Sequence, residues 1–213
     1  MRASLVRVLL CFGLLLTARA HSVWVEPDGQ GGLRVRFAEP DGKYEKSPGH
    51  LDSLTPPAAF ALGAAEPVSI DAPKQSDRFD LRGASVTNVL GVETSFTVRA
   101  KRKPLFYARW QPAGGAPATP VLTLDLVPTG TPGEVRVWFR GQPLGKVKLK
   151  LRTPDEKETD VVADADGIVQ FETQQSGLYL LTLAHHRENL AGVHMGRPYE
   201  QTSHNAALTW VQP

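Results

Sequence analysis

The stretch Leu33-Arg34-Val35-Arg36-Phe37 alternates apolar and basic side chains, as expected of a β-strand with one buried face. The same two-residue period recurs in five further segments, at residues 95–98, 106–110, 122–127, 135–139 and 147–151. Turns rich in glycine, proline and aspartate separate these segments, and no apolar stripe of helical period continues for more than about two turns. The sequence therefore predicts an all-β protein built from β-sandwiches.

A run of small residues and three prolines interrupts this pattern at residues 111–120. Such a composition is typical of a semi-rigid linker or of a crossing between sheets. We therefore predict two immunoglobulin/transthyretin-like domains, at residues 21–111 and 121–213, joined by a linker at residues 112–120. In the second domain, the turns Gly141-Gln142-Pro143-Leu144 and Asp164-Ala165-Asp166-Gly167 precede the strand entry Gly177-Leu178-Tyr179. This order resembles that of transthyretin-like and carboxypeptidase-regulatory-like β-sandwich modules.

Residues 1–20 have the pattern of a cleaved secretory signal peptide. Arg2 and Arg7 supply positive charge, residues 8–16 are apolar, and Ala18-Arg19-Ala20 fits a cleavage site. The apolar run is shorter than the roughly 20 residues that cross a bilayer as a helix. We therefore expect an exported protein, periplasmic or secreted, that does not span the membrane.

Cleavage also changes the charge and the cysteine content. Lysines and arginines fall from 24 to 21 against 22 acidic residues, because residues 1–20 contain three arginines. This balance favours neither nucleic acid nor an anionic membrane as a partner. The only cysteine, Cys11, is removed as well, so core burial or a metal must stabilise the exported chain without disulfides.

Cleavage after Ala20 makes His21 the first residue of the exported protein. The α-amine and a ring nitrogen of an N-terminal histidine can hold one metal ion together, with no further spacing required. Nitrogen ligands suit nickel, cobalt, copper and zinc. Only the processed protein has this chelate, so export and metal binding are linked by one cleavage.

Two C-terminal strands place further histidines at one edge of the predicted core. Alternate residues of a strand share a face, so His185 lies on the apolar face of the strand at 179–186 and His204 on that of the strand at 204–210. If these strands are antiparallel neighbours, the end of one meets the start of the other. We therefore predict that His185 and His204 lie together and bind one divalent transition-metal ion with His21. The alternative is that each is a core-edge histidine bonded to a backbone carbonyl.

Other residues are weaker candidates for metal ligands. His186 and His194 fall on an outer face or in a loop, and His50 lies in a turn. Met195 can offer a thioether to a soft ion such as copper(I), although packing against the sandwich is the simpler interpretation. Three acids near residues 37–54 are candidate oxygen ligands, although solvated surface charges are commoner: Glu39, Glu45 and Asp52.

Both ends of the chain resemble one protein family. The start His21-Ser22-Val23-Trp24-Val25-Glu26-Pro27 resembles the opening of periplasmic NikM-like proteins, a domain of unknown function linked to nickel and cobalt uptake. The closing pattern is also similar, with Gly177-x-Tyr179, His185, the GRPY sequence at residues 196–199, and His204. The resemblance implies an exported β-sandwich protein that binds or helps to deliver a first-row divalent ion. His21 carries over directly as a ligand, and any uptake depends on a separate membrane transporter.

Three functions are therefore open. The first is a periplasmic metal-binding protein that supports uptake or delivery of nickel, cobalt or copper. The second is a metal-free β-sandwich interaction module at the cell surface. The third is a copper-dependent oxidase with the N-terminal histidine brace of polysaccharide monooxygenases, which the absence of mature cysteines disfavours. The sequence shows no Ser-His-Asp set, phosphate-binding loop or paired-carboxylate spacing, so we expect a protein that is not an enzyme.

Overall fold

A computed structural model describes residues 21–213 except residues 40–42, 64–65 and 114–117. The predicted signal peptide at residues 1–20 lies outside the described residues. Within the described part, the regular structure consists of strands and one short 3-10 helix, η1 (His50–Ser53). The prediction of an all-β fold is confirmed. No helix among these residues is long and apolar enough to cross a bilayer.

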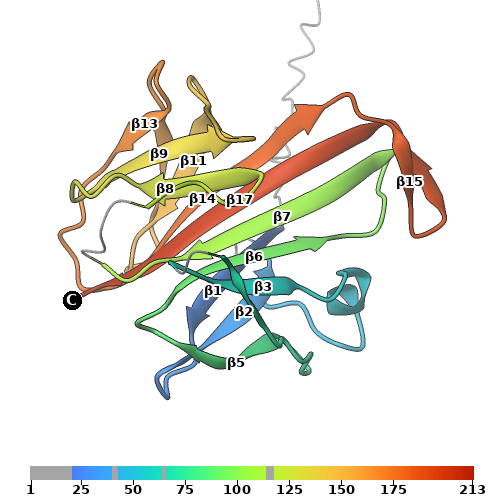
Figure 1. Cartoon of the computed structure of the whole chain (residues 1–213), viewed down its shortest axis with the longest axis horizontal. Coiled ribbons are helices and arrows are strands. Elements are labelled where there is room, and N and C mark those ends of the chain that lie inside the picture. Colours follow the sequence, from blue (N-terminus) through green and yellow to red (C-terminus); the bar gives the residue numbers. More distant parts are fainter. Residues whose placement is uncertain (1–20, 40–42, 64–65, 114–117) are drawn as a thin grey trace, which may run out of the picture.

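An eight-stranded sheet forms the middle of the molecule (Figure 1). Its strands, in spatial order, are β12 (Glu158–Val162), β11 (Lys148–Arg152), β14 (Gly177–Glu188), β17 (Gln201–Gln212), β7 (Arg102–Trp110), β6 (Val89–Ser95), β3 (Ala58–Leu62) and β4 (Val68–Ile70). The antiparallel pairing of β14 with β17 confirms one predicted contact. Strand β17 also pairs with β7, in parallel.

The pairing of β7 with β17 joins the two predicted domains. Strand β7 comes from before the predicted linker at 112–120 and β17 from after it, so one sheet contains strands from both sides. Whether residues 21–111 and 121–213 fold independently stays a prediction that unfolding experiments can test. One predicted strand, at 95–98, is wrong, because β6 ends at Ser95 and the chain then leads into the connection to β7.

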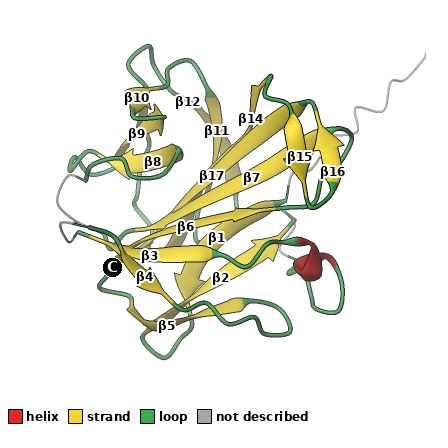
Figure 2. Cartoon of the chain, turned by 45° about the vertical axis from the view of Figure 1, so that its right-hand side comes forward, coloured by secondary structure: helices red, strands yellow, loops and turns green. Residues whose placement is uncertain are grey.

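Two smaller sheets cover opposite faces of the central sheet (Figure 2). One contains β1 (Ser22–Pro27), β2 (Gly32–Ala38) and β5 (Phe79–Ser85). The other contains β8 (Leu124–Pro128), β9 (Glu134–Phe139), β10 (Gln142–Pro143) and β13 (Ile168–Gln170). A separate hairpin, β15 (Gly192–His194) with β16 (Arg197–Tyr199), lies between β14 and β17 in the chain.

Alternating side chains of the central strands divide the core into two clusters. In β7, Phe106 and Ala108 pack in the cluster between the central sheet and β1–β2, whereas Tyr107 packs in the cluster between the central sheet and β8–β9. In β17, Ala207 and Leu208 are divided in the same way. Strands β7 and β17 are therefore buried on both faces, as the two-residue period of a strand allows.

A buried ion pair connects the central sheet to β8. Arg109 of β7 and Asp125 of β8 are 1% and 0% exposed, with Nε–Oδ1 and NH2–Oδ2 distances of 2.8 and 2.7 Å. Asp125 also accepts the backbone N–H groups of Val121 and Leu122. The carboxylate thus fixes the start of the second half of the chain against a strand of the first.

Candidate metal centre

The hairpin of β1 and β2 returns the chain to His21. Its turn is held by Asp28, whose carboxylate accepts the backbone N–H groups of Gln30 and Gly32 at 2.7 and 2.9 Å. The register pairs Ser22 with Ala38, so the end of β2 lies beside the first residue of the predicted exported chain. The N–H of Glu45 then donates to the carbonyl of Phe37 at 2.8 Å, which holds Glu45 at the same edge.

The short helix η1 brings His50 to this edge. Asp52 caps the helix by accepting the N–H of Gly49 at 3.0 Å, and it also accepts the hydroxyl of Ser47. An ion pair with Lys74 is the largest of the causes that lower the pKa of Asp52 to about 2. Asp52 is therefore occupied in shaping the loop, which favours a structural role over metal ligation.

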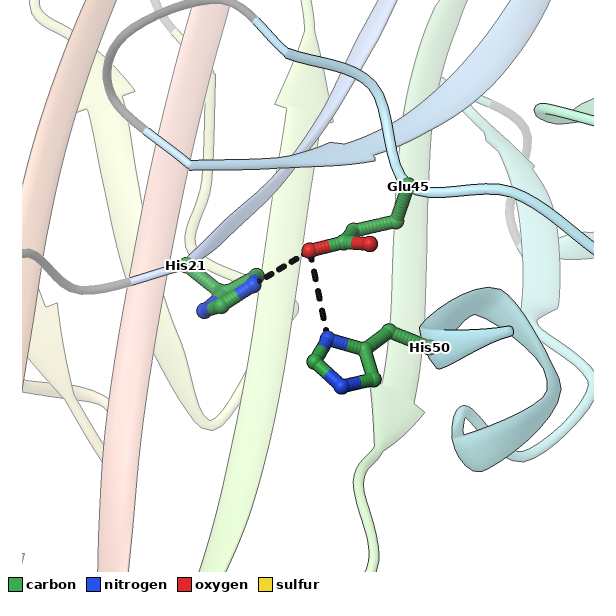
Figure 3. Close-up of side chains that lie close together, drawn as sticks. All are labelled: His21, Glu45 and His50. Carbon is green, nitrogen blue, oxygen red and sulfur yellow. Dashed lines mark hydrogen bonds and ion pairs between the residues drawn. The ribbon is translucent and has the colours of Figure 1, made fainter.

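His21, Glu45 and His50 form a group that could hold a metal ion. The Nε2 atom of His21 lies 2.7 Å from Oε1 of Glu45, and the same oxygen lies 3.4 Å from Nδ1 of His50 (Figure 3). One ligand atom from each of the three residues lies within 4.8 Å of the others. A second acid, Glu39, places Oε1 3.7 Å from Nε2 of His21.

The donor set of this group matches known metal chemistry. Two imidazole nitrogens and one carboxylate oxygen are a common three-ligand set that leaves positions open for a further ligand. His21 and Glu45 are 28% and 21% exposed in their side chains, whereas His50 is 58% exposed. An ion from solution can therefore reach the group without a change in the core.

A pocket of about 520 Å³ opens beside these residues. Both ends of the chain and the start of β7 contribute to it. Its lining residues are His21, Phe37, His50, Phe96, Arg99, Arg102, Pro104, Phe106, His185, Ser203 and Asn205. His185 thus faces the same pocket as His21 and His50, although it comes from the opposite end of the sequence.

His185 reaches this pocket because of a β-bulge in β14. Leu183 pairs with Ala206 and His186 with His204, so two residues of β14 lie opposite the single residue Asn205. His185 has a φ of 63°, in the left-handed region that is rare for residues other than glycine. Its ring nitrogen Nδ1 lies 3.4 Å from the hydroxyl of Ser203. Desolvation lowers the pKa of this imidazole and the nearby arginines lower it further, which favours the neutral form that can ligate a metal.

The expectation that His185 and His204 lie together is wrong. The bulge shifts the alternation of β14 by one residue, so His185 faces the pocket whereas His204 points to the opposite face of the sheet. His204 is 2% exposed, and its ring nitrogens contact the hydroxyl of Tyr107 at 3.1 Å and the carboxylate of Glu188 at 2.9 Å. It therefore cannot share one ion with His21.

The two remaining C-terminal histidines lie outside the group of His21, Glu45 and His50. His186 lies on the face of His204, and its ring centroid is 4.4 Å from that of Phe139. His194 lies in the hairpin of β15 and β16, with Nε2 3.2 Å from the hydroxyl of Ser95. Met195 next to it is 59% exposed, so it does not pack on the sandwich.

The chain matches no protein-family model, and no curated protein is significantly similar to it in sequence. The metal hypothesis therefore depends on the residues themselves and on the resemblance described above.

Glu45 and His50 are stronger candidates for metal ligands in the structure than the sequence indicates. The sequence favours a solvated charge for Glu45 and a turn residue for His50, because neither lies in a strand. A usable signal was present in the β1–β2 hairpin, whose glycine-rich turn at residues 28–32 implies antiparallel return of the chain. That return brings Ala38 next to Ser22, and the N–H of Glu45 then binds the carbonyl of Phe37 at the same edge.

Proposed function

We propose that this chain is an exported, periplasmic protein that binds a divalent transition-metal ion as cargo and supports its uptake or delivery. Nickel, cobalt and copper are the ions that suit its nitrogen-rich ligands, and a separate membrane transporter is the partner that uptake requires. The observation that carries the proposal is the convergence of His21, Glu45 and His50 within ligand distance of one another at the mouth of a pocket.

Export adds a metal ligand that is not a side chain, the α-amine of His21. Removal of residues 1–20 frees the α-amine of His21, so this residue offers two nitrogen donors. Glu45 and His50 add one oxygen and one nitrogen donor, and His185 faces the same pocket with a lowered pKa, which favours its neutral form. Copper binds sites of this kind most tightly, so affinity alone does not decide which ion is carried.

The test compares two N-termini in calorimetric titrations with Ni²⁺ and Cu²⁺ in a buffer that does not chelate. The first protein begins at His21, as verified by mass spectrometry of the exported product, and the second has one alanine before it. The added residue turns the α-amine of His21 into a peptide nitrogen, which is a poor metal donor, so we expect at least about tenfold weaker binding, since even indirect partners of a metal ligand contribute 10–100-fold.

Side-chain variants complete this test. Glu45→Gln and His50→Ala are expected to weaken binding, whereas His204→Gln on the opposite face is the control that leaves it unchanged. Equal affinity in the two N-terminal forms would remove the amine from the site. Absence of binding by every form would refute metal binding as the function.

One observation favours the alternative of a metal-free interaction module. The segment that contains the β15–β16 hairpin exposes three large apolar side chains, with Leu190 at 49%, Val193 at 71% and Met195 at 59%. Exposed apolar groups close together are typical of contact surfaces. If the processed protein binds neither metal, this hairpin becomes the main candidate for function.

A further inference from the structure

Two arginines face each other across the turn between β6 and β7. Arg99 and Arg102 exchange two backbone hydrogen bonds of 2.9 Å, which makes them a directly opposed pair in a two-residue hairpin. The residues between them, Ala100 and Lys101, have φ of 46° and 58°, as such a turn requires. Opposed residues of a hairpin point to the same side, and both arginines line the pocket described above.

This pair has no acidic partner in the part of the chain that the structure describes. Neither guanidinium forms an ion pair with a described carboxylate, and the ring contact of Arg99 is with Phe96, at 5.6 Å from its centroid. Like charges directly opposed across two strands destabilise a hairpin. Placing two cations together at one pocket wall therefore has an unfavourable energy that no ion pair with a described carboxylate offsets.

The pocket lining contains two fixed cations and no acid. Its ionisable residues are His21, His50, His185, Arg99 and Arg102, and no acid is among the lining residues. Glu45 lies at one end, where it contacts both His21 and His50. Glu39 and Glu45 beside His21 can balance the charge of a divalent ion bound there, which leaves the positive charges of Arg99 and Arg102 uncompensated.

We propose that the pocket binds the metal ion together with a small organic carboxylate, which ligates the ion at the His21 end and contacts Arg99 and Arg102 with a second carboxylate group. This inference rests on the proposed function. A volume of about 520 Å³ exceeds that of a bare ion and falls in the range of small-molecule sites, about 300–1,000 Å³. Guanidinium groups bind carboxylates in a two-bonded geometry, which gives the second carboxylate group a defined place.

The test uses malonate, a small dicarboxylate, with the processed protein both metal-free and loaded with Ni²⁺. Calorimetry measures malonate binding, and the nickel retained after gel filtration shows that malonate does not strip the ion. We expect malonate to bind the nickel-loaded protein more tightly than the metal-free one. Arg99→Gln and Arg102→Gln should each weaken malonate binding at least about tenfold, since the loss of one charge-assisted hydrogen bond lowers an affinity by about that factor.

Control variants separate this inference from the proposed function. Arg82→Gln, at an exposed position of β5, should leave malonate binding unchanged, and the variants at 99 and 102 should bind Ni²⁺ alone as the wild type does. Nickel binding without malonate binding, or malonate binding that ignores both arginines, overturns the inference but not the proposed function. Equal malonate affinity with and without nickel overturns the coupling to metal. Loss of nickel from the protein to malonate also overturns the coupling. If no form of the protein binds nickel, the proposed function itself is overturned.

Discussion

Replacing Asp125 by alanine should destabilise both halves of the chain together. The substitution leaves the guanidinium of Arg109 buried without its partner, and removal of one member of a buried ion pair costs about 3–5 kcal/mol. The N–H groups of Val121 and Leu122 also lose their acceptor, so we expect the upper part of this range. Such a loss is a large fraction of a typical total stability of about 5–15 kcal/mol.

Urea denaturation followed by tryptophan fluorescence measures this change without the ionic screening that guanidinium chloride adds. With a slope of about 2 kcal/mol per molar urea, a loss of about 4 kcal/mol lowers the midpoint by about 2 M. The double variant Arg109→Met with Asp125→Leu removes both charges, and it should stay only about 1–3 kcal/mol below the wild type because the two backbone N–H groups still lack an acceptor.

Hydrogen exchange shows whether the destabilisation is shared. Because β7 and β17 pair within one sheet, peptides from β1 and from β9 should lose protection together in Asp125→Ala. If β1 keeps its protection while β9 loses it, residues 21–111 form an independent domain and the reasoning from the shared sheet is refuted. A midpoint shift below about 0.5 M would equally refute the assigned role of the ion pair.

Two further predictions concern the bulge and the buried histidine. Asn205→Ala removes the acceptor of the N–H of His185 at 3.0 Å and the donor to two backbone carbonyls, so the free energy of unfolding should fall by about 2–3 kcal/mol. Urea denaturation measures this loss, and calorimetry should show a lower Ni²⁺ affinity as well. An unchanged urea midpoint would contradict the role given to this amide. Burial lowers the pKa of His204 below 6.5, so the unfolded chain binds its proton first as the pH falls, and stability should decrease as the pH falls through about 6.5. His204→Gln should reduce that decrease in urea midpoints, and an undiminished decrease would assign it to other groups.

The two-residue period was sufficient to predict most strands but not their partners. It identified residues 33–37, 106–110 and 135–139 because each has one strongly apolar face, and β2, β7 and β9 contain them. It also supported the antiparallel pair of β14 and β17, which a single loop connects. The parallel pairing of β17 with β7 joins residues about 100 positions apart, and no local turn in the sequence predicts it. The prediction of two domains did not anticipate a sheet that contains strands from both.

The candidate site was predictable only in part, for a related reason. His21 was identified from its position after a cleavage site, which is a property of the sequence alone. Glu45 and His50 belong to loops, where no periodicity assigns a direction to a side chain. Their convergence on His21 depends on the register of β1 with β2 and on the backbone bond from Glu45 to Phe37, and both are tertiary facts.

The bulge in β14 is the feature that decides which histidines can act together. A residue of a type other than glycine in the left-handed region costs about 1–3 kcal/mol, so His185 holds this conformation only because its surroundings impose it. Asn205 imposes it by accepting the N–H of His185 while donating to the carbonyls of Leu105 and Ser203. Without the extra residue, strict alternation would turn His185 to the face of His204, away from His21. The bulge therefore moves one imidazole from the second core cluster to the pocket at the predicted N-terminus, and the same shift leaves His204 enclosed among Tyr107 and Glu188 as a structural side chain.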